Sequence, residues 1–61
     1  MMTVKDIKEV LLVSDTKAYQ IIKQLNEELQ KKGFMTVRGK VSSVYFNERF
    51  FGNTVYNEKI N

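Results

Sequence analysis

The sequence places two amphipathic segments almost end to end between Thr3 and Leu29, with only Leu12-Val13-Ser14 to separate them. Apolar residues recur at three- and four-residue spacing in both segments, which predicts two helices that each bury one stripe of side chains. A second helix that begins this soon has to cross the first at a steep angle. The pattern therefore predicts a helix-turn-helix.

Capping residues mark the ends of both helices. Thr3 is a good N-cap and Asp6 follows three residues later, so the first helix is expected to begin at about residue 4. Ser14 is the expected N-cap of the second helix. Gly33 stands where a left-handed residue would close that helix, which is therefore expected to end at about Lys32.

The second helix has a polar face opposite its apolar stripe. The residues on that face and its two shoulders are Thr16, Lys17, Tyr19, Gln20, Lys23, Gln24 and Glu27. The row is neutral or positive until Glu27, which fits a helix whose N-terminal half enters the major groove of DNA. An ordinary solvated surface would show the same composition, so this alternative stays open.

A short hairpin is expected after Gly33. Residues 34–37 are apolar or β-branched and predict a strand, Arg38-Gly39-Lys40 predicts a tight turn, and Val41-Ser42 predicts the returning strand. Its tip would carry Arg38 and Lys40 toward whatever the second helix faces, where they would bind phosphate or the minor groove. The alternative is a turn that is polar only because it is exposed.

A third short helix is expected from Val44 to Phe51, capped by Ser43 and stopped by Gly52. Some of its aromatic residues, which are Tyr45, Phe46, Phe50 and Phe51, are expected to cover the core, and one or two to remain outside as a self-association patch. Residues 53–61 are expected to form a flexible tail. The predicted fold is mostly α with a small β-hairpin, a winged helix-turn-helix domain over residues 1–52.

Composition argues against several classes of function. The chain has no histidine and no cysteine, which leaves no imidazole or thiolate for catalysis or zinc binding, so neither an enzyme nor a cofactor is expected. Its longest apolar run is too short for a membrane span, and charges at residues 5–9 interrupt any signal sequence, so a cytoplasmic protein is expected. The net charge of +3 lies within residues 14–51 and weakly favours a polyanionic partner.

The order of these segments resembles a known family. The segments VKDIKEVL, VSDTKAYQIIKQLNEELQKKG, FMTVRGKV and SVYFNERFFG, over about residues 2–52, resemble the small excisionase-type and regulatory helix-turn-helix proteins of phages and integrative elements. These proteins are similar to the winged MerR-like group, and the resemblance implies that the second helix enters the major groove while the wing contacts the flanking backbone. Matching positions are Thr16, Lys17, Tyr19, Gln20 and Lys23 in the helix and Arg38 and Lys40 in the wing. Lysine stands at position 17 where the family has arginine, and it lacks the bidentate fork that reads guanine.

The sequence therefore predicts a protein that binds double-stranded DNA sequence-specifically, without catalytic activity. Two roles remain open: an excisionase-like architectural factor that acts with a recombinase or integrase, and a small transcriptional regulator that acts on RNA polymerase. Several copies, or a dimer, would assemble on DNA. The rival hypothesis is a protein-binding module that inhibits or redirects a host protein through the aromatic segment and the tail. A structural homodimer without a separate ligand is a third possibility.

Overall fold

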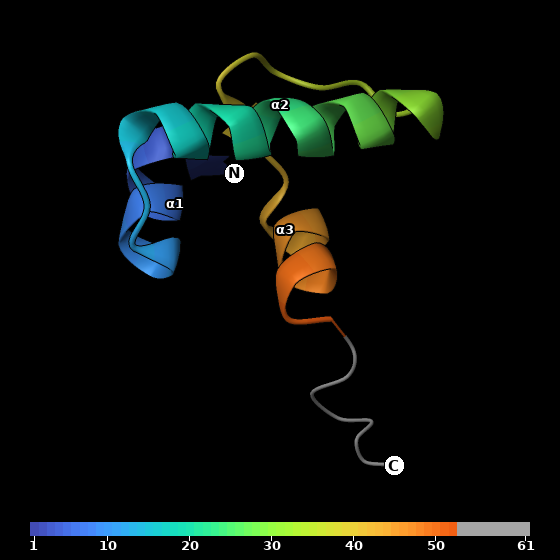
Figure 1. The fold of residues 1–61 in the computed structure, drawn as a ribbon. Coiled ribbons are helices and arrows are strands. Elements are labelled where there is room, and N and C mark those ends of the chain that lie inside the picture. The colour runs from blue at the N-terminus through green and yellow to red at the C-terminus, as the bar shows by residue number, and fades with distance from the viewer. Residues whose placement is uncertain (53–61) are drawn as a thin grey trace, which may run out of the picture.

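The computed structural model describes residues 1–52. The expected tail, residues 53–61, lies outside the described residues. The elements are β1 (Met2–Thr3), α1 (Val4–Leu11), α2 (Asp15–Lys31), β2 (Lys40–Val41) and α3 (Ser43–Phe50). The long helix α2 forms the upper layer of the molecule, with α1 and α3 below it (Figure 1).

The two predicted N-terminal helices and the short turn between them are confirmed. The amide of Asp6 donates to Thr3 Oγ1 (3.3 Å) and the amide of Thr3 donates to Asp6 Oδ2 (2.9 Å), so a complete capping box starts α1. Ser14 Oγ accepts from the amide of Lys17 and starts α2. Between the helices Leu12 takes a left-handed conformation with φ 56°, which turns the chain sharply.

The end of α2 is also as predicted. The amide of Gly33 donates to Gln30 O and the amide of Phe34 donates to Leu29 O, both at 3.0 Å. This pair of bonds, with Gly33 at φ 92°, is a Schellman closure. It satisfies carbonyls that the last turn of a helix leaves without partners, and it turns the chain back along α2.

The predicted hairpin is wrong. Residues 34–37 form no strand, and β2 pairs instead with β1, antiparallel, with Met2 opposite Val41 and Thr3 opposite Lys40. The turn after residue 37 does form, closed by the amide of Lys40 on Val37 O, with Gly39 at the positive φ of 79° that a type II turn requires. The segment before it is therefore a loop held against α2, not the first strand of a wing.

The third helix forms one residue earlier than expected. Its N-cap is Ser42, whose Oγ accepts from the amide of Tyr45, and not Ser43. The expectation that its aromatics divide between core and surface is confirmed. Phe46 is fully buried and Tyr45 nearly so, whereas Phe50 and Phe51 are more than two-fifths exposed.

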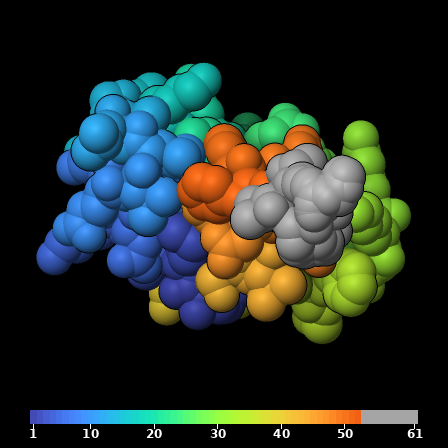
Figure 2. Space-filling view, turned by 90° about the horizontal axis from the view of Figure 1, so that it is seen from below, coloured from blue at the N-terminus to red at the C-terminus, as the bar shows by residue number. Residues whose placement is uncertain are grey.

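The core lies where all the elements meet. Its fully buried large side chains are Phe46 from α3, Ile7 from α1 and Val41 from β2, and they pack with residues 18, 22 and 25 of α2. Seen from below, α3 lies between α1 and the C-terminal end of α2 (Figure 2). Within residues 1–52, no helix is long and apolar enough to cross a membrane.

Candidate nucleic-acid interface

The outward face of α2 is open to solvent along its first half. Every position that the periodicity assigned to this face is exposed: Thr16, Lys17, Tyr19, Gln20, Lys23, Gln24 and Glu27. The opposite face supplies the buried residues of the helix. The apolar spacing in the sequence therefore predicted the solvated row of this helix correctly.

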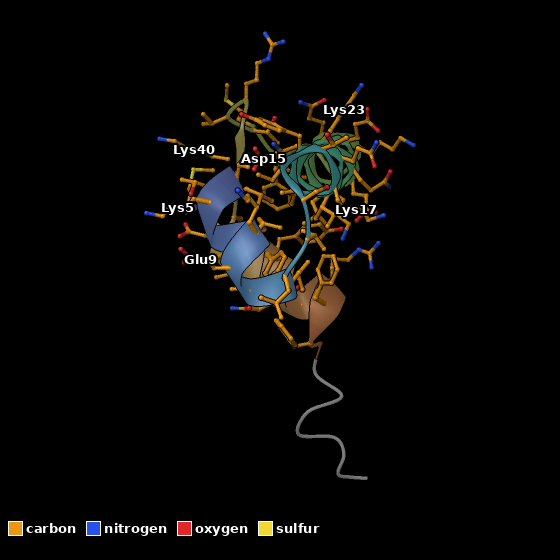
Figure 3. All side chains as sticks on the ribbon, turned by 60° about the vertical axis from the view of Figure 1, so that its left-hand side comes forward. Lys5, Glu9, Asp15, Lys17, Lys23 and Lys40 are labelled. Atoms are coloured by element: carbon orange, nitrogen blue, oxygen red, sulfur yellow. The ribbon has the colours of Figure 1, made fainter. Side chains whose placement is uncertain are left out.

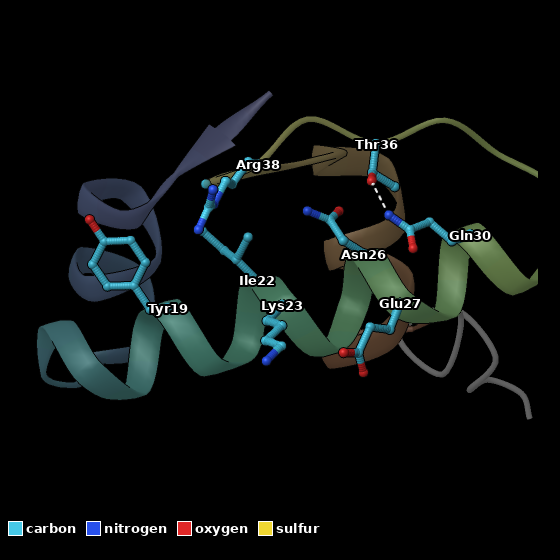
Figure 4. Close-up of a pocket in the computed structure, with 9 residues that line it drawn as sticks. Tyr19, Ile22, Lys23, Asn26, Glu27, Gln30, Thr36 and Arg38 are labelled. Carbon is cyan, nitrogen blue, oxygen red and sulfur yellow. Dashed lines mark hydrogen bonds between the residues drawn. The ribbon is translucent and has the colours of Figure 1, made fainter.

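A hollow of about 650 Å³ lies on one flank of this face, between α2 and the loop that precedes β2. Tyr19 and Lys23 line it from the helix, and Arg38 lines it from the loop (Figure 4). Arg38 reaches over α2 toward Tyr19 and Ile22. The structure thus brings together three of the predicted site residues, from segments 15 or more positions apart in the sequence.

A second hollow, of about 420 Å³, lies on the other flank, between α2 and α3. Its polar lining from α2 is Lys17, Gln20 and Gln24, and α3 contributes Arg49 and Phe50. The outward row of α2 is therefore a ridge between two hollows. Thr16 is exposed near the beginning of the ridge and lines neither hollow.

Lys40 does not join this face. It belongs to β2, opposite Thr3, and its side chain is exposed. In Figure 3 Lys40 and Lys5 lie on one side of the molecule, and Lys17 and Lys23 on the other. Arg38 and Lys40 were expected to project together from the tip of a hairpin. The strand pairing with β1 separates them instead, because β2 is drawn to the edge formed by the N-terminal residues.

Two carboxylates of α2 are bound by cations from other elements. Lys8 Nζ of α1 lies 2.6 Å from Asp15 Oδ1, and the hydrogen bond to Asp15 raises the pKa of Lys8. Glu28 accepts from Arg49 Nε at 2.7 Å, from Arg49 Nη2 at 2.9 Å and from the Tyr45 hydroxyl at 2.6 Å. These bonds, with a further one from Gln24, hold the pKa of Glu28 well below its usual range.

The cations of the ridge, and Arg38 beside it, are not bound by carboxylates of residues 1–52 in this way. Within the described part of the chain, Lys17, Lys23 and Arg38 form no ion pair, so they remain available to an external anion. Glu27 is the carboxylate that lines the first hollow, toward the later part of the helix. The first half of the ridge is therefore positive, with its nearest carboxylate, Asp15, paired to Lys8.

Sequence reasoning missed two groups that shape this face. Asn26 is buried, and its Nδ2 donates to Lys40 O at 2.8 Å and to Val37 O at 3.3 Å, which ties the loop to α2. A polar residue four positions after Ile22, on the apolar stripe, was the available signal. The other group is the Glu28–Arg49 pair, which binds α3 to α2, and no local pattern predicts that Arg49 pairs with a residue 21 positions away.

The described residues hold no cluster of three or more acidic side chains that would bind a metal ion. Comparisons with known proteins give one informative match. The chain is 40% identical over 47 residues to the ICEBs1 excisionase of Bacillus subtilis (strain 168). The aligned region covers 77% of this chain and 73% of that protein. No protein-family model matches the chain. No solved structure shows a significant similarity to it.

Proposed function

This chain belongs to the excisionase family, the small DNA-binding proteins of recombination in mobile elements, and from that premise we propose that α2 is the helix with which it reads a duplex. The helix enters the major groove with its first half, and Arg38 binds the phosphates beside that groove. Contacts to bases from Gln20 give sequence preference, Lys23 binds backbone phosphate at the first hollow, and Lys17 supplies charge without the bidentate geometry of arginine. The chain performs no chemistry of its own in this role.

The observation that carries the proposal is the first hollow. Tyr19, Lys23 and Arg38 line an open space beside an exposed helix, and neither cation is neutralised within residues 1–52. A phosphate backbone is a line of negative charge that such cations bind with release of counterions. The Tyr19 ring, 58% exposed, adds an apolar surface for a sugar or a thymine methyl, and its hydroxyl is a donor for phosphate.

The test is a salt titration of binding. A duplex is first selected from a random pool, and footprinting on it reports how many copies bind and at what spacing. Binding by the wild type should weaken steeply with salt, and Lys23→Ala and Arg38→Ala should each reduce the slope of log K against log salt by about 1. Lys5→Ala removes the same charge from the opposite side of the molecule and should leave the slope unchanged. Equal slopes for all four proteins would exclude the proposed interface.

The same family membership supports our proposal that the protein partner is a recombinase or integrase. RNA polymerase, with a role in transcription, is our second choice of partner. Several copies on adjacent sites would explain how so small a protein organises DNA for a recombinase. A footprint longer than one copy covers, with protection that appears cooperatively, would support this arrangement. A single protected half-site would contradict it.

A second candidate function, contact with a protein, is favoured by the surface of α3. Val44 is 68% exposed, and Phe50 and Phe51 are 43% and 45% exposed on a helix of eight residues. The affinity of an apolar protein contact should change little with salt, whereas the affinity of groove binding should fall steeply, so the same titration distinguishes the two. Val44→Ser, at a position that lines neither hollow, should reduce binding to a recombinase or self-association while leaving the affinity of one copy for DNA unchanged.

A further inference from the structure

The loop between α2 and β2 exposes apolar side chains to an unusual degree. Met35 is 96% exposed, Phe34 61% and Val37 49%. These side chains are exposed because residues 34–37 form a loop that joins neither the sheet nor the core cluster. A 61-residue protein gains little stability from its core and benefits from burying such residues. Their exposure therefore calls for a partner that covers them.

The charge around the loop identifies the class of partner. Between Leu29 and Asn47 the sequence contains no aspartate or glutamate, whereas it contains Lys31, Lys32, Arg38 and Lys40. All four cations are exposed, and none of them forms an ion pair within the part of the chain that the structure describes. One of them, Lys32, places its Nζ over the Tyr45 ring, 4.8 Å from the centroid. An apolar protein surface has no reason to require four cations without carboxylate partners around its contact. A polyanion with an apolar interior, which is what a DNA duplex presents, satisfies both features.

The loop is also held in place before any partner binds. The Schellman closure fixes Phe34 at one end through its bond to Leu29 O, and Gln30 Nε2 donates to Thr36 Oγ1 at 2.7 Å in the middle. Asn26 fixes the other end through Val37 O and Lys40 O. Met35 therefore stands between two anchored neighbours, so presenting its side chain requires little further ordering of the backbone.

We propose that Met35, supported by Phe34, is an apolar wedge that this protein inserts between base pairs from the minor groove, so that the duplex bends as α2 binds beside it. The inference rests on the proposed function, since it needs α2 on DNA. Proteins that bend DNA from the minor groove use side chains of this kind, methionine and phenylalanine among them, flanked by cations that grip the backbone. Unstacking is easiest at flexible pyrimidine–purine steps, so such a step is expected opposite the loop in the bound site.

The experiment measures bending and binding separately, with the selected duplex carrying a fluorophore at each end. Wild-type protein should shorten the end-to-end distance by a bend in the range of about 20–90° that wedges produce. Met35→Ser and Phe34→Ser should still bind, with the salt dependence of the wild type, and lose most of the bend. Met35→Leu keeps an apolar side chain and should restore it. Val44→Ser is the matched control, because Val44 is an apolar residue of α3 that is 68% exposed, close to the 61% of Phe34, and it should bend DNA as the wild type does.

The outcomes separate the wedge from the function on which it rests. No binding by the wild type would overturn the proposed function itself. Binding with an undiminished bend in Met35→Ser and Phe34→Ser would overturn the wedge alone. A loss of self-association or recombinase binding in these variants, with the bend intact, would likewise overturn it by showing a protein contact. Because both side chains are largely exposed, the serine variants should melt at the temperature of the wild type, which confirms that they are folded.

Discussion

Asn26→Ala tests how the loop is held to α2. The substitution removes the donor to Val37 O and Lys40 O, at 3.3 and 2.8 Å. Each bond contributes about 1 kcal/mol net, and their loss leaves two carbonyls without their partner. Asn26 Oδ1 is buried and accepts no hydrogen bond from any of residues 1–52, so its removal offsets part of the loss. We therefore expect the free energy of unfolding to fall by about 1–2 kcal/mol, a large share for a domain of this size.

Urea denaturation, followed by circular dichroism, measures this loss. With a slope of about 1 kcal/mol per molar urea, the midpoint should fall by about 1–2 M. Gln30→Ala is the matched control because it removes the other tether of the same loop, an exposed bond to Thr36, and it should lower the stability by less than about 0.5 kcal/mol. Hydrogen exchange adds a local readout. The amide of Lys40, which closes the turn on Val37 O, should exchange faster in Asn26→Ala.

The result that would refute this reasoning is a midpoint for Asn26→Ala equal to that of Gln30→Ala. A second refutation would come from Asn26→Leu. Leucine fills a similar volume and provides no donor, so it should remain less stable than the wild type. Stability equal to the wild type would show that burial at position 26, and not the bonds to the two carbonyls, holds the loop.

Three further predictions concern stability. Leu12→Gly should stabilise the protein by about 1 kcal/mol, because Leu12 has φ 56° and an 87% exposed side chain, and a lower melting temperature would contradict this. Ile7→Ala should lower the free energy of unfolding by about 2–5 kcal/mol in urea denaturation, since Ile7 is fully buried, whereas Val37→Ala at a half-exposed site should change it little. The hydrogen bonds from Arg49, Gln24 and Tyr45 lower the pKa of Glu28 in the folded state, so they stabilise the protein above the unfolded pKa of 4.5, and this stabilisation is lost as the pH falls below that value. The urea midpoint of the wild type should therefore fall between about pH 6 and pH 3, and it should fall less in Glu28→Gln. An equal fall in both proteins would show that the Glu28–Arg49 pair contributes nothing to stability.

Local signals predicted the two N-terminal helices well. Thr3, Ser14 and Gly33 act within three or four residues of their own positions, through bonds that the sequence spacing already specifies. The apolar stripe of α2 likewise placed Lys23 and its neighbours in solvent. For this reason the sequence alone predicts the residues of the ridge.

Non-local competition explains the wrong hairpin. Residues 34–37 have the composition of a strand, yet they compete with the N-terminal residues for pairing with Val41. Met2 pairs with Val41 instead, because the capped start of α1 holds Met2 beside the core. Asn26 then takes the carbonyls of Val37 and Lys40. Ser42 displaced Ser43 as the cap for a related reason, since burial of Tyr45 and Phe46 fixes where α3 begins.

The same pairings explain how a modest net charge suits a polyanion. On its own α2 is electrically balanced, with Asp15, Glu27 and Glu28 against three lysines. Lys8 of α1 and Arg49 of α3 neutralise two of those carboxylates, and they do so by the contacts that pack α1 and α3 against α2. Folding thereby changes the balance of charge on α2, and it leaves a positive charge on the side of the helix that faces away from α1 and α3. Lys8→Glu should therefore weaken DNA binding in the salt titration although Lys8 lines neither hollow, because it leaves the Asp15 carboxylate unpaired near the phosphates.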